Sequence, residues 1–428
     1  MKTQGLRRVV GLMLVSIVVG CAGPAEGGFL QSDKSRLAPD ATEAEMAEQV
    51  AGNSAFAFDL YQKLREGRDE NLFYSPYSIS SALAMTSAGA RGETEQQMAE
   101  TLHFTLPADR LHPVFNGLDL ELAQRSEGAE GKEGEGFRLN IVNALWGQDG
   151  YKFLSEFLDI LAEHYGAGLR LLDFKTVPEE ARETINDWVS DQTEDRIEDL
   201  IPEGAIDTWT RLVLVNAIYF DAAWLHPFEA ESTHEGTFQL LDGGEVTVPM
   251  MAQTEPFPYA EGEGYQAVEL PYDGGELSMV ILLPRAGKFE AFESSLDAGR
   301  VSGILRDLYQ EDVRLTMPKF TFNSSFRLAQ TLSDMGMPDA VVYQVADFSG
   351  MDGSRELFIG EVIHKAFVSV DEAGTEAAAA SAVVLPAGAA PEPAPPIEVT
   401  VDRLFVFLIR DIETGTILFI GRVVDPSV

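Results

Sequence analysis

The sequence Val370-Asp371-Glu372-Ala373-Gly374-Thr375-Glu376-Ala377-Ala378-Ala379-Ala380-Ser381, near the C-terminal end of the chain, carries the strongest indication of the fold. Apart from Glu376, every side chain from Thr375 to Ala382 is small. Side chains alternate between the two faces of a strand, so one face here would be small and uncharged while Glu376 points to solvent. That inward face would consist of Thr375, Ala377, Ala379, Ser381, Val383 and Leu385. The pattern is typical of a loop that can enter a packed sheet as a strand.

The proline-rich run that follows Leu385 leaves a second interpretation open. Alanine- and proline-rich segments also serve as flexible linkers between domains. Only strand-like segments follow Pro396, and they are too few to build a second domain. The sequence therefore favours insertion over a linker.

The composition is that of an acidic globular protein. The 428 residues are 45% hydrophobic, which is enough for one large core or two modest ones, and the net charge is −38. A surface of this charge repels phosphate backbones, and no basic stripe in the sequence counters it, so we expect no nucleic-acid partner. The same argument disfavours control by heparin-like polyanions.

The N-terminus has the features of an export signal. Lys2, Arg7 and Arg8 precede the apolar run 9–19, which is too short to span a bilayer stably. We therefore expect residues 1–20 to be a signal peptide and the protein to be exported.

The end of that apolar run indicates a lipid anchor. Val18-Val19-Gly20-Cys21 resembles a bacterial lipobox, and Cys21 is the single cysteine of the chain, so it has no partner for a disulfide. The expected product is a lipoprotein acylated at Cys21, whose residues 21–44 form a flexible tether to the membrane of the cell envelope or the cell surface, unless it is released. An ordinary signal peptide cleaved after Ala22 is the alternative.

One mixed α+β domain is expected over residues 45–428, because no repeat or internal linker divides it. The run 212–220 is continuously apolar except for Asn216, which predicts a central strand covered on both faces. Strands at 266–272 and 277–283 are joined through Asp273-Gly274-Gly275, a hairpin signal. Further strands are expected at 139–146, 312–321, 361–370, 403–410 and 417–423, and helices ending near Gly67 and at 78–90, 153–165, 179–191 and 326–335.

Further motifs accompany the stretch around Gly374. They are Asn71–Ser80, Leu214–Phe220 with Trp224, Pro227 and Phe228, Val248–Met251, Ala346–Met351, Phe407–Arg410 and Gly421–Val423. Together with Glu372–Ala380, in this order, they make the chain resemble an inhibitory serpin over nearly all of residues 50–428. Leu404 departs from the family's terminal signature, which has Pro, Ser or Thr there.

The resemblance implies the serpin fold, with three β-sheets, eight or nine helices and an exposed reactive-centre loop at about 374–396. It also implies an irreversible suicide inhibitor of serine or cysteine proteases, which is not itself an enzyme. In that mechanism the protease attacks the loop and forms an acyl-enzyme, the cut loop inserts into the main sheet, and the distorted protease cannot deacylate. The expected partner is a target protease in a covalent complex, and the inhibitor is expected to be a monomer without cofactor or metal.

The resemblance assigns roles to three groups of residues. The hinge consists of Glu372, Gly374, Thr375, Ala377, Ala378, Ala379 and Ala380. The shutter, a polar network beneath the opening strands, consists of Ser75, Ser78, Asn216 and His364. The breach, at the top of the sheet, consists of Trp224, Lys319 and Glu372. For the shutter, a set of satisfied core polar groups is the plainer interpretation, since buried polar groups are costly unless paired.

The position of the reactive bond depends on which end of the loop is used for counting. The family's spacing from Glu372 places it between Gly388 and Ala389, with Ala387 and Ala390 as rivals. Counting back from Phe405 places it several residues later, because the loop is longer than is typical on that side.

The loop composition narrows the class of protease. Between Gly374 and Asp402 there is no Lys, Arg or aromatic residue. The specificity pockets of trypsin-like and chymotrypsin-like enzymes would therefore find no preferred side chain. Small residues favour an elastase-like or subtilisin-like target.

Two other functions are disfavoured by the sequence. A non-inhibitory serpin, acting as a carrier or structural protein, would usually have bulky, charged or proline residues in the hinge, and from Thr375 to Ala380 this hinge has none on the face expected to enter the sheet. A surface hydrolase is disfavoured because the sequence contains no G-x-S-x-G, H-E-x-x-H or C-x-x-C motif.

Overall fold

The computed structural model describes residues 28–125, 138–375 and 395–428. Sixteen strands and ten α-helices are found in these ranges. The helices are α1 Glu43–Leu64, α2 Pro76–Ser87, α3 Gly92–Thr101, α4 Ala108–Gln124, α5 Ser155–Tyr165, α6 Pro178–Gln192, α7 Phe289–Glu293, α8 Ala298–Arg306, α9 Ala329–Met335 and α10 Ser349–Asp352.

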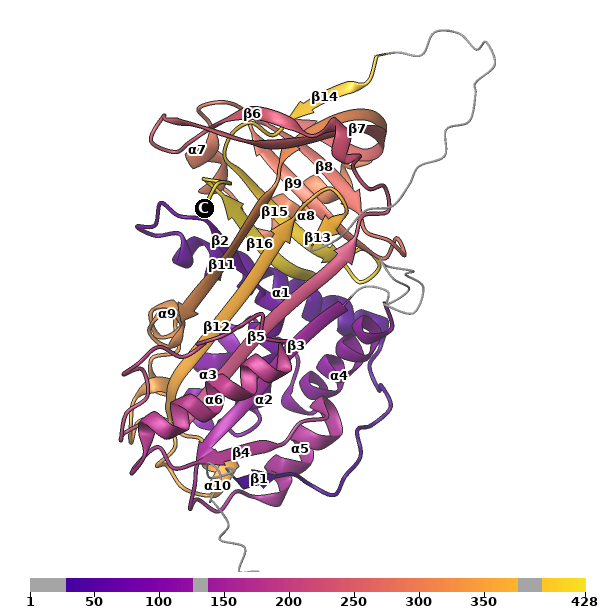
Figure 1. Cartoon of the computed structure of the whole chain (residues 1–428). Coiled ribbons are helices and arrows are strands. Elements are labelled where there is room, and N and C mark those ends of the chain that lie inside the picture. The colour runs from indigo at the N-terminus through magenta and orange to yellow at the C-terminus, as the bar shows by residue number, and fades with distance from the viewer. Residues whose placement is uncertain (1–27, 126–137, 376–394) are drawn as a thin grey trace, which may run out of the picture.

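The first sheet has seven strands in the order β1-β4-β3-β5-β13-β12-β11 and runs the length of the molecule (Figure 1). Its strands are β1 Gly28–Leu30, β3 Arg138–Gln148, β4 Leu169–Leu172, β5 Leu212–Ala223, β11 Phe320–Arg327, β12 Ile359–Val370 and β13 Gly374–Thr375. We call it the main sheet. The mixed α+β class predicted from the sequence is confirmed.

The apolar run of β5 is covered on both faces, as predicted. Val213, Val215 and Ala217 pack in one cluster with residues of α6. Leu212 and Leu214 pack in another with residues of α2 on the opposite face. From Leu212 to Ala217 the strand thus alternates between two helical layers, and Ile218 and Phe220 pack in the cluster shared with the second sheet, which explains why nearly every position is apolar.

The second sheet has nine strands in the order β14-β10-β7-β8-β9-β15-β16-β2, with β6 paired to β7. They are β2 Leu72–Tyr74, β6 His234–Gln239, β7 Glu245–Gly262, β8 Tyr265–Pro271, β9 Leu277–Pro284, β10 Tyr309–Pro318, β14 Ile397–Thr400, β15 Phe405–Asp411 and β16 Ile417–Val423. The third sheet expected from the family is not separate in hydrogen bonding. The 18-residue strand β7 pairs with β6 and β10 and also with β8, so its continuous backbone joins the two sheets.

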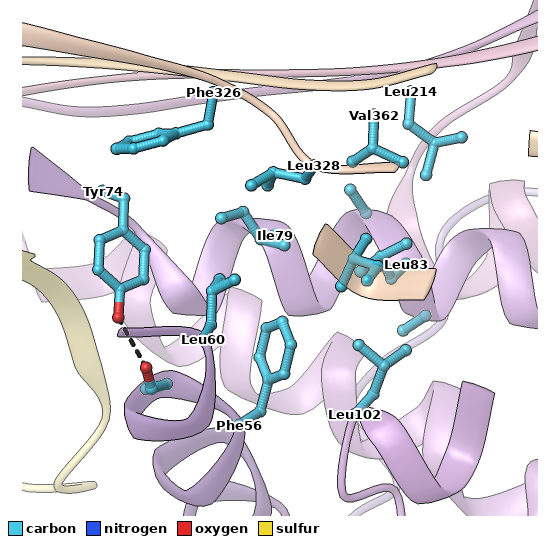
Figure 2. Packing of buried hydrophobic residues seen from close by; sticks show 14 of the residues in the cluster. Phe56, Leu60, Tyr74, Ile79, Leu83, Leu102, Leu214, Phe326, Leu328 and Val362 are labelled. Atoms are coloured by element: carbon cyan, nitrogen blue, oxygen red, sulfur yellow. Dashed lines mark hydrogen bonds between the residues drawn. The ribbon is translucent and has the colours of Figure 1, made fainter. Parts of the chain in front are cut away.

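The largest hydrophobic cluster lies between the main sheet and the helices behind it (Figure 2). Phe56 and Leu60 of α1 face Ile79 and Leu83 of α2 in this view, and Leu214 reaches down from the sheet. The buried Tyr74 donates its hydroxyl to the carbonyl of Ala57, 2.6 Å away. Since buried side chains of this kind contribute about 1.5–3 kcal/mol each, this layer dominates stability.

Three details differ from the sequence-based expectations. The strand predicted over 312–321 is two strands, β10 and β11, with Lys319 between them. The helix predicted from Phe326 begins only at Ala329, because Phe326 belongs to β11 and pairs with His364 of β12. The helix count exceeds eight or nine because short helices such as α7 and α10, of five and four residues, are included.

The N-terminal segment is the main correction to the predicted domain limits. β1 pairs with β4, Lys34 forms an ion pair with Glu163 of α5 at 3.2 Å, and Arg36 one with Asp119 of α4 at 2.6 Å. The folded domain therefore extends to Gly28, and the tether expected over 21–44 is shorter than predicted. Its remaining part, Cys21 and the signal peptide lie outside the described residues.

Candidate functional site

The predicted hinge begins inside the main sheet. Gly374 and Thr375 form the short strand β13, which pairs antiparallel with Ala223 and Ala222 of β5. On its other side Thr375 pairs with Val370 of β12. Below this point β5 and β12 pair directly with each other, from Ile359↔Leu212 to Phe367↔Tyr219. The two central strands thus part only at their upper ends, and β13 occupies the space between them (Figure 1).

Gly374 is required by the close approach of β5. A Cβ atom at this position would lie 2.1 Å from the carbonyl oxygen of Ala222 and 2.7 Å from the Cα of Ala223. These neighbours are backbone atoms, which cannot give way as a flexible side chain can. Glycine usually marks a need for backbone freedom, whereas at this position the requirement is steric.

A tight turn before Gly374 sends the chain back into the sheet. The amide of Asp371 donates to the carbonyl of Gly374 at 2.9 Å. The carboxylate of Asp371 accepts the amides of Ala373 at 2.9 Å and Gly374 at 3.3 Å. Side-chain bonds of this type are a usual way for aspartate to fix a turn.

Thr375 is the first hinge side chain to be buried, with 1% of its surface exposed. Its hydroxyl lies 2.9 Å from the hydroxyl of Tyr272. Burial raises the pKa of Tyr272, so this hydroxyl stays protonated. The small polar side chain is therefore fully accommodated and paired.

An aromatic stack supports the turn at the predicted breach. The rings of Trp224 and Tyr272 lie nearly parallel with centroids 4.7 Å apart. Trp224 Nε1 donates to the carbonyl of Asp371 at 3.0 Å, and its backbone amide donates to the carbonyl of Ala373 at 2.9 Å. Both ends of the turn are thus held by the residue that follows β5.

Glu372 connects the turn to the second sheet. Lys319 Nζ lies 2.7 Å from Glu372 Oε2, and Thr233 donates its hydroxyl to Glu372 Oε1 at 2.7 Å. Partial burial disfavours the carboxylate, but these hydrogen bonds outweigh it and lower the pKa of Glu372. The lysine is about one-third exposed, so the pair is worth about 0–1 kcal/mol and holds the position of the turn more than it stabilises the fold.

The four predicted shutter residues meet in one buried network. Asn216 Nδ2 donates to Ser78 Oγ, and its amide oxygen contacts His364 Nδ1. The backbone amide of Ser75 donates to His364 Nε2 at 3.1 Å. Ser75 also caps α2 by accepting the amide of Ser78 at 3.2 Å. The network therefore links β5, β12 and the start of α2.

The hydrogen bonds determine the tautomer of His364. A backbone N–H can only donate, so Nε2 must be the acceptor and the proton must sit on Nδ1, facing the Asn216 oxygen. Burial lowers the pKa of this imidazole to about 3, which keeps it neutral. A second proton on Nε2 would face the Ser75 N–H, so protonation would break the network.

Sequence reasoning missed several residues of the site. Asn143 of β3 lies opposite Asn216 in the ladder and accepts its amide, and Asn143 Nδ2 donates to the Ser78 carbonyl at 3.4 Å. A polar residue between the apolar residues Val142 and Ala144 was the available signal. Tyr272, Thr233 and Asp371 had no such signal, because their roles depend on neighbours far away in the chain.

The remaining predicted residues cannot be placed. Ala377, Ala378, Ala379 and Ala380 of the hinge, and the reactive-bond candidates Ala387, Gly388, Ala389 and Ala390, lie outside the described residues. Within the described ranges, no group of three or more His, Cys, Asp or Glu residues could hold a metal ion. The helices of the described chain also include none with the length and apolarity of a membrane span.

Comparisons with known proteins agree with this architecture. The model of the family described as serpin (serine protease inhibitor) matches residues 51–426. A serpin-like protein of Thermococcus kodakarensis is 41% identical, over 99% of this chain and the whole of that protein. A leukocyte elastase inhibitor of Xenopus tropicalis is 40% identical over 87% of this chain and 97% of its own length. Human thyroxine-binding globulin, solved with its hormone, superposes with a TM-score of 0.80 at 31% identity over 90% of this chain and all of that one.

Proposed function

Because this chain belongs to the serpin family, we propose that it is a suicide inhibitor that traps serine proteases by inserting its cleaved reactive loop into the main sheet. The observation that carries the proposal is the position of Thr375. This residue already pairs with both β5 and β12, at the one point where those strands part. The loop that follows it starts from within the sheet.

The register of β13 gives the path of insertion. Pairing is antiparallel, so each further loop residue would lie opposite one residue earlier on β5, starting from Thr375↔Ala222. Ala377 would then face Phe220, Ser381 would reach Asn216 and Leu385 would reach Leu212. These β5 positions face the cores shared with α2 and the second sheet. The side chains assigned to the inward face of the loop in the sequence would therefore be the ones that become buried on insertion.

The shutter network lies directly on this path. Asn216 of β5 and His364 of β12 are paired across the two strands that would have to separate. Insertion would break their contact and offer Ser381 as a new partner beside Asn216. A buried polar group that loses its hydrogen-bond partner carries a desolvation penalty. That penalty is avoided here if Ser381 replaces His364 as the partner of Asn216.

The chemistry would trap the protease as an ester. The catalytic serine oxygen of the protease attacks the carbonyl carbon of the reactive bond. The C–N bond breaks, the new amine takes the proton from the protease's general base, and the N-terminal part of the loop stays esterified. Hydrolysis then needs water and an intact oxyanion hole. Rapid insertion would pull the protease away and deform that hole before water attacks.

The target class follows from the loop composition and one relative. Small residues surround the bond between Gly388 and Ala389 and its rivals, and the curated relative from Xenopus tropicalis is named as an elastase inhibitor. An elastase-like or subtilisin-like protease is therefore the proposed partner. The same chemistry would extend to a cysteine protease.

A carrier function is the second candidate. It is favoured by the similarity to thyroxine-binding globulin, which was solved with a bound hormone. The small hinge residues up to Ala380 argue against it, because a carrier has no need of a hinge that can be buried.

Incubation with pancreatic elastase and with subtilisin distinguishes the candidates. An inhibitor forms a covalent adduct with the protease that survives SDS, and it releases a short C-terminal peptide. Inhibitor molecules that are cleaved but do not retain the protease become more heat-resistant than the uncleaved protein. A carrier is cut but forms no adduct and gains no heat resistance. Mass spectrometry of the released peptide identifies the reactive bond.

The proposed location is the cell envelope. Lipidation of Cys21 after removal of residues 1–20 would hold the inhibitor at a membrane, where exported proteases act. Metabolic labelling with palmitate in a bacterial host tests this proposal. The native chain should incorporate label and a Cys21→Ser variant should not. Label in both variants, or in neither, contradicts it.

A further inference from the structure

Arg170 has an unusual environment for a cation in this acidic protein. It lies in β4, directly opposite Phe29 of β1 on one side and Trp146 of β3 on the other. Its guanidinium carbon is 5.2 Å from the centre of the Phe29 ring, 5.3 Å from that of Trp146 and 4.4 Å from that of Trp188 in α6. Three aromatic rings therefore surround the charge.

No carboxylate neutralises this arginine within the described residues. Its side chain makes the three ring contacts, and among the described groups it has neither an ion pair nor a hydrogen-bond acceptor. Partial burial lowers the pKa of Arg170, and no neighbouring acid offsets that effect. Arginine nevertheless stays charged in proteins, so its N–H donors remain available.

A cavity of about 270 Å³ lies beside Arg170. Arg170 lines it together with the apolar side chains of Phe29, Met85, Ile141 and Trp188. The cavity lies at the notch where β4 begins at Leu169, beyond which β3 continues without that neighbour. Its volume is close to the lower end of the range for small-ligand sites.

One acid also lines the cavity, but it is already paired. Asp119 of α4 accepts Arg36 Nη2 at 2.6 Å. Arg170 is the one cation among the described residues that line the cavity, and the one lining acid is already neutralised by Arg36, whereas the whole chain carries −38. An anion is thus favoured here although the rest of the protein repels it.

We propose that this cavity, named here the Arg170 pocket, binds a small aromatic carboxylate. Aromatic faces cover the guanidinium plane, so its N–H edge is the part left to donate two parallel hydrogen bonds to a carboxylate. The apolar body of the ligand would lie against Phe29, Met85 and Trp188. A phosphate or sulfate lacks such a body and should bind weakly.

The first test compares two probes on the unaltered protein. 2-Naphthylacetate and its uncharged amide share the same ring system, and calorimetry measures both. The acid should bind at least about tenfold more tightly, the ratio that one charge-assisted bond of about 1.4 kcal/mol provides. Equal affinities, or no binding of the acid at millimolar concentration, would overturn the proposal.

The second test locates the binding site. Arg170→Met keeps the length of the side chain and removes the charge, and Arg306→Met removes an exposed arginine on α8 as the matched control. Affinity for the acid should fall about tenfold in the first variant and stay unchanged in the second. Trp188→Leu, which leaves the cation in place, should weaken binding of both probes. Unchanged binding by Arg170→Met shows that the pocket is not the site.

Discussion

The side-chain oxygens of Tyr272 and Thr375 lie 2.9 Å apart, and both residues are buried. Tyr272 belongs to the hairpin of the second sheet, and Thr375 is the last described residue before the reactive loop. The ring of Tyr272 also stacks on Trp224, which holds the hinge turn. This contact therefore joins the second sheet to the residue from which insertion would proceed.

The substitution Thr375→Arg should convert the inhibitor into a substrate. Insertion would require a guanidinium to be buried without a partner beside Tyr272, at a cost of several kcal/mol. The acyl-enzyme would then hydrolyse before the loop enters the sheet. SDS gels should show cleaved inhibitor and active protease instead of adduct. Thr400→Arg, at an exposed position of β14, is the control and should trap as the native chain does.

The hydrogen bond between Tyr272 and Thr375 should appear as a coupling energy. In a double-mutant cycle of Tyr272→Phe and Thr375→Val, urea unfolding should give a coupling of about 1 kcal/mol, because each single change leaves a buried hydroxyl unpaired. The Trp224 stack persists in both variants, so the rest of the breach is retained. Strictly additive effects would show that the two hydroxyls do not stabilise each other.

The stability of the native protein should decrease in acid partly because of His364. Its folded pKa of about 3 lies below the unfolded value of about 6.5, so the unfolded chain binds the extra proton between these limits. The contribution of this residue is therefore complete above about pH 6.5 and declines as the pH falls toward 3. Urea unfolding at several pH values measures the slope.

Substitution isolates the part of the slope that belongs to His364. His364→Gln should be less stable at neutral pH and should have a smaller pH dependence between pH 6.5 and 4. His234→Gln, at an exposed position, should leave the slope unchanged. His112, whose pKa burial also lowers to about 4, supplies a remaining slope in all three proteins. Equal slopes for the native chain and His364→Gln would contradict the assigned protonation state.

An exposed aromatic group should influence the lifetime of the trapped complex. Trp209 and Tyr343, 64% and 38% exposed, have ring centroids 6.4 Å apart, and Tyr343 contacts Phe358 just before β12. In the insertion register Leu385 would pair with Leu212, the first residue of β5, so the reactive bond and its attached protease would emerge beyond this end of the strand, on the side of the turn that contains Trp209. The apolar surface there would contact a tethered partner, for which even weak contacts count.

The corresponding variants separate trapping from retention. Trp209→Ala and Tyr343→Ala should form adduct in normal yield but release active protease several-fold faster over days. Tyr309→Ala removes an exposed ring from β10 and should not change the lifetime. Release at the native rate from all three would show that the patch plays no part in retention.

Much of this site could be predicted because its signals are local in the chain. Small side chains from Thr375 onward, a serine followed by proline at the start of α2, and an apolar run broken by Asn216 can each be recognised without a structure. The N-terminal segment was misjudged for the same reason. Residues 28–41 are polar and lack periodicity, and their pairing with β4, α4 and α5 depends on distant partners.

Asn143 shows the limit of such reasoning within the site. Its sequence neighbourhood marks it only as a polar residue in a strand. The antiparallel register of β3 and β5 places it opposite Asn216, and α2 supplies Ser78 to both. A shift of the ladder by one residue would have turned it to the other face.

By itself the sequence determined the serpin fold, the burial of β5 on both faces, and a loop whose side chains are small, uncharged toward the sheet and free of cations or rings. These properties follow from residue type and spacing along one segment. Only the tertiary structure decided that Gly374 is needed to avoid the carbonyl of Ala222, that His364 is neutral with its proton on Nδ1, and that Arg170 has rings rather than acids around it. Steric exclusion, protonation and pairing are set by atoms that folding brings together from distant parts of the chain.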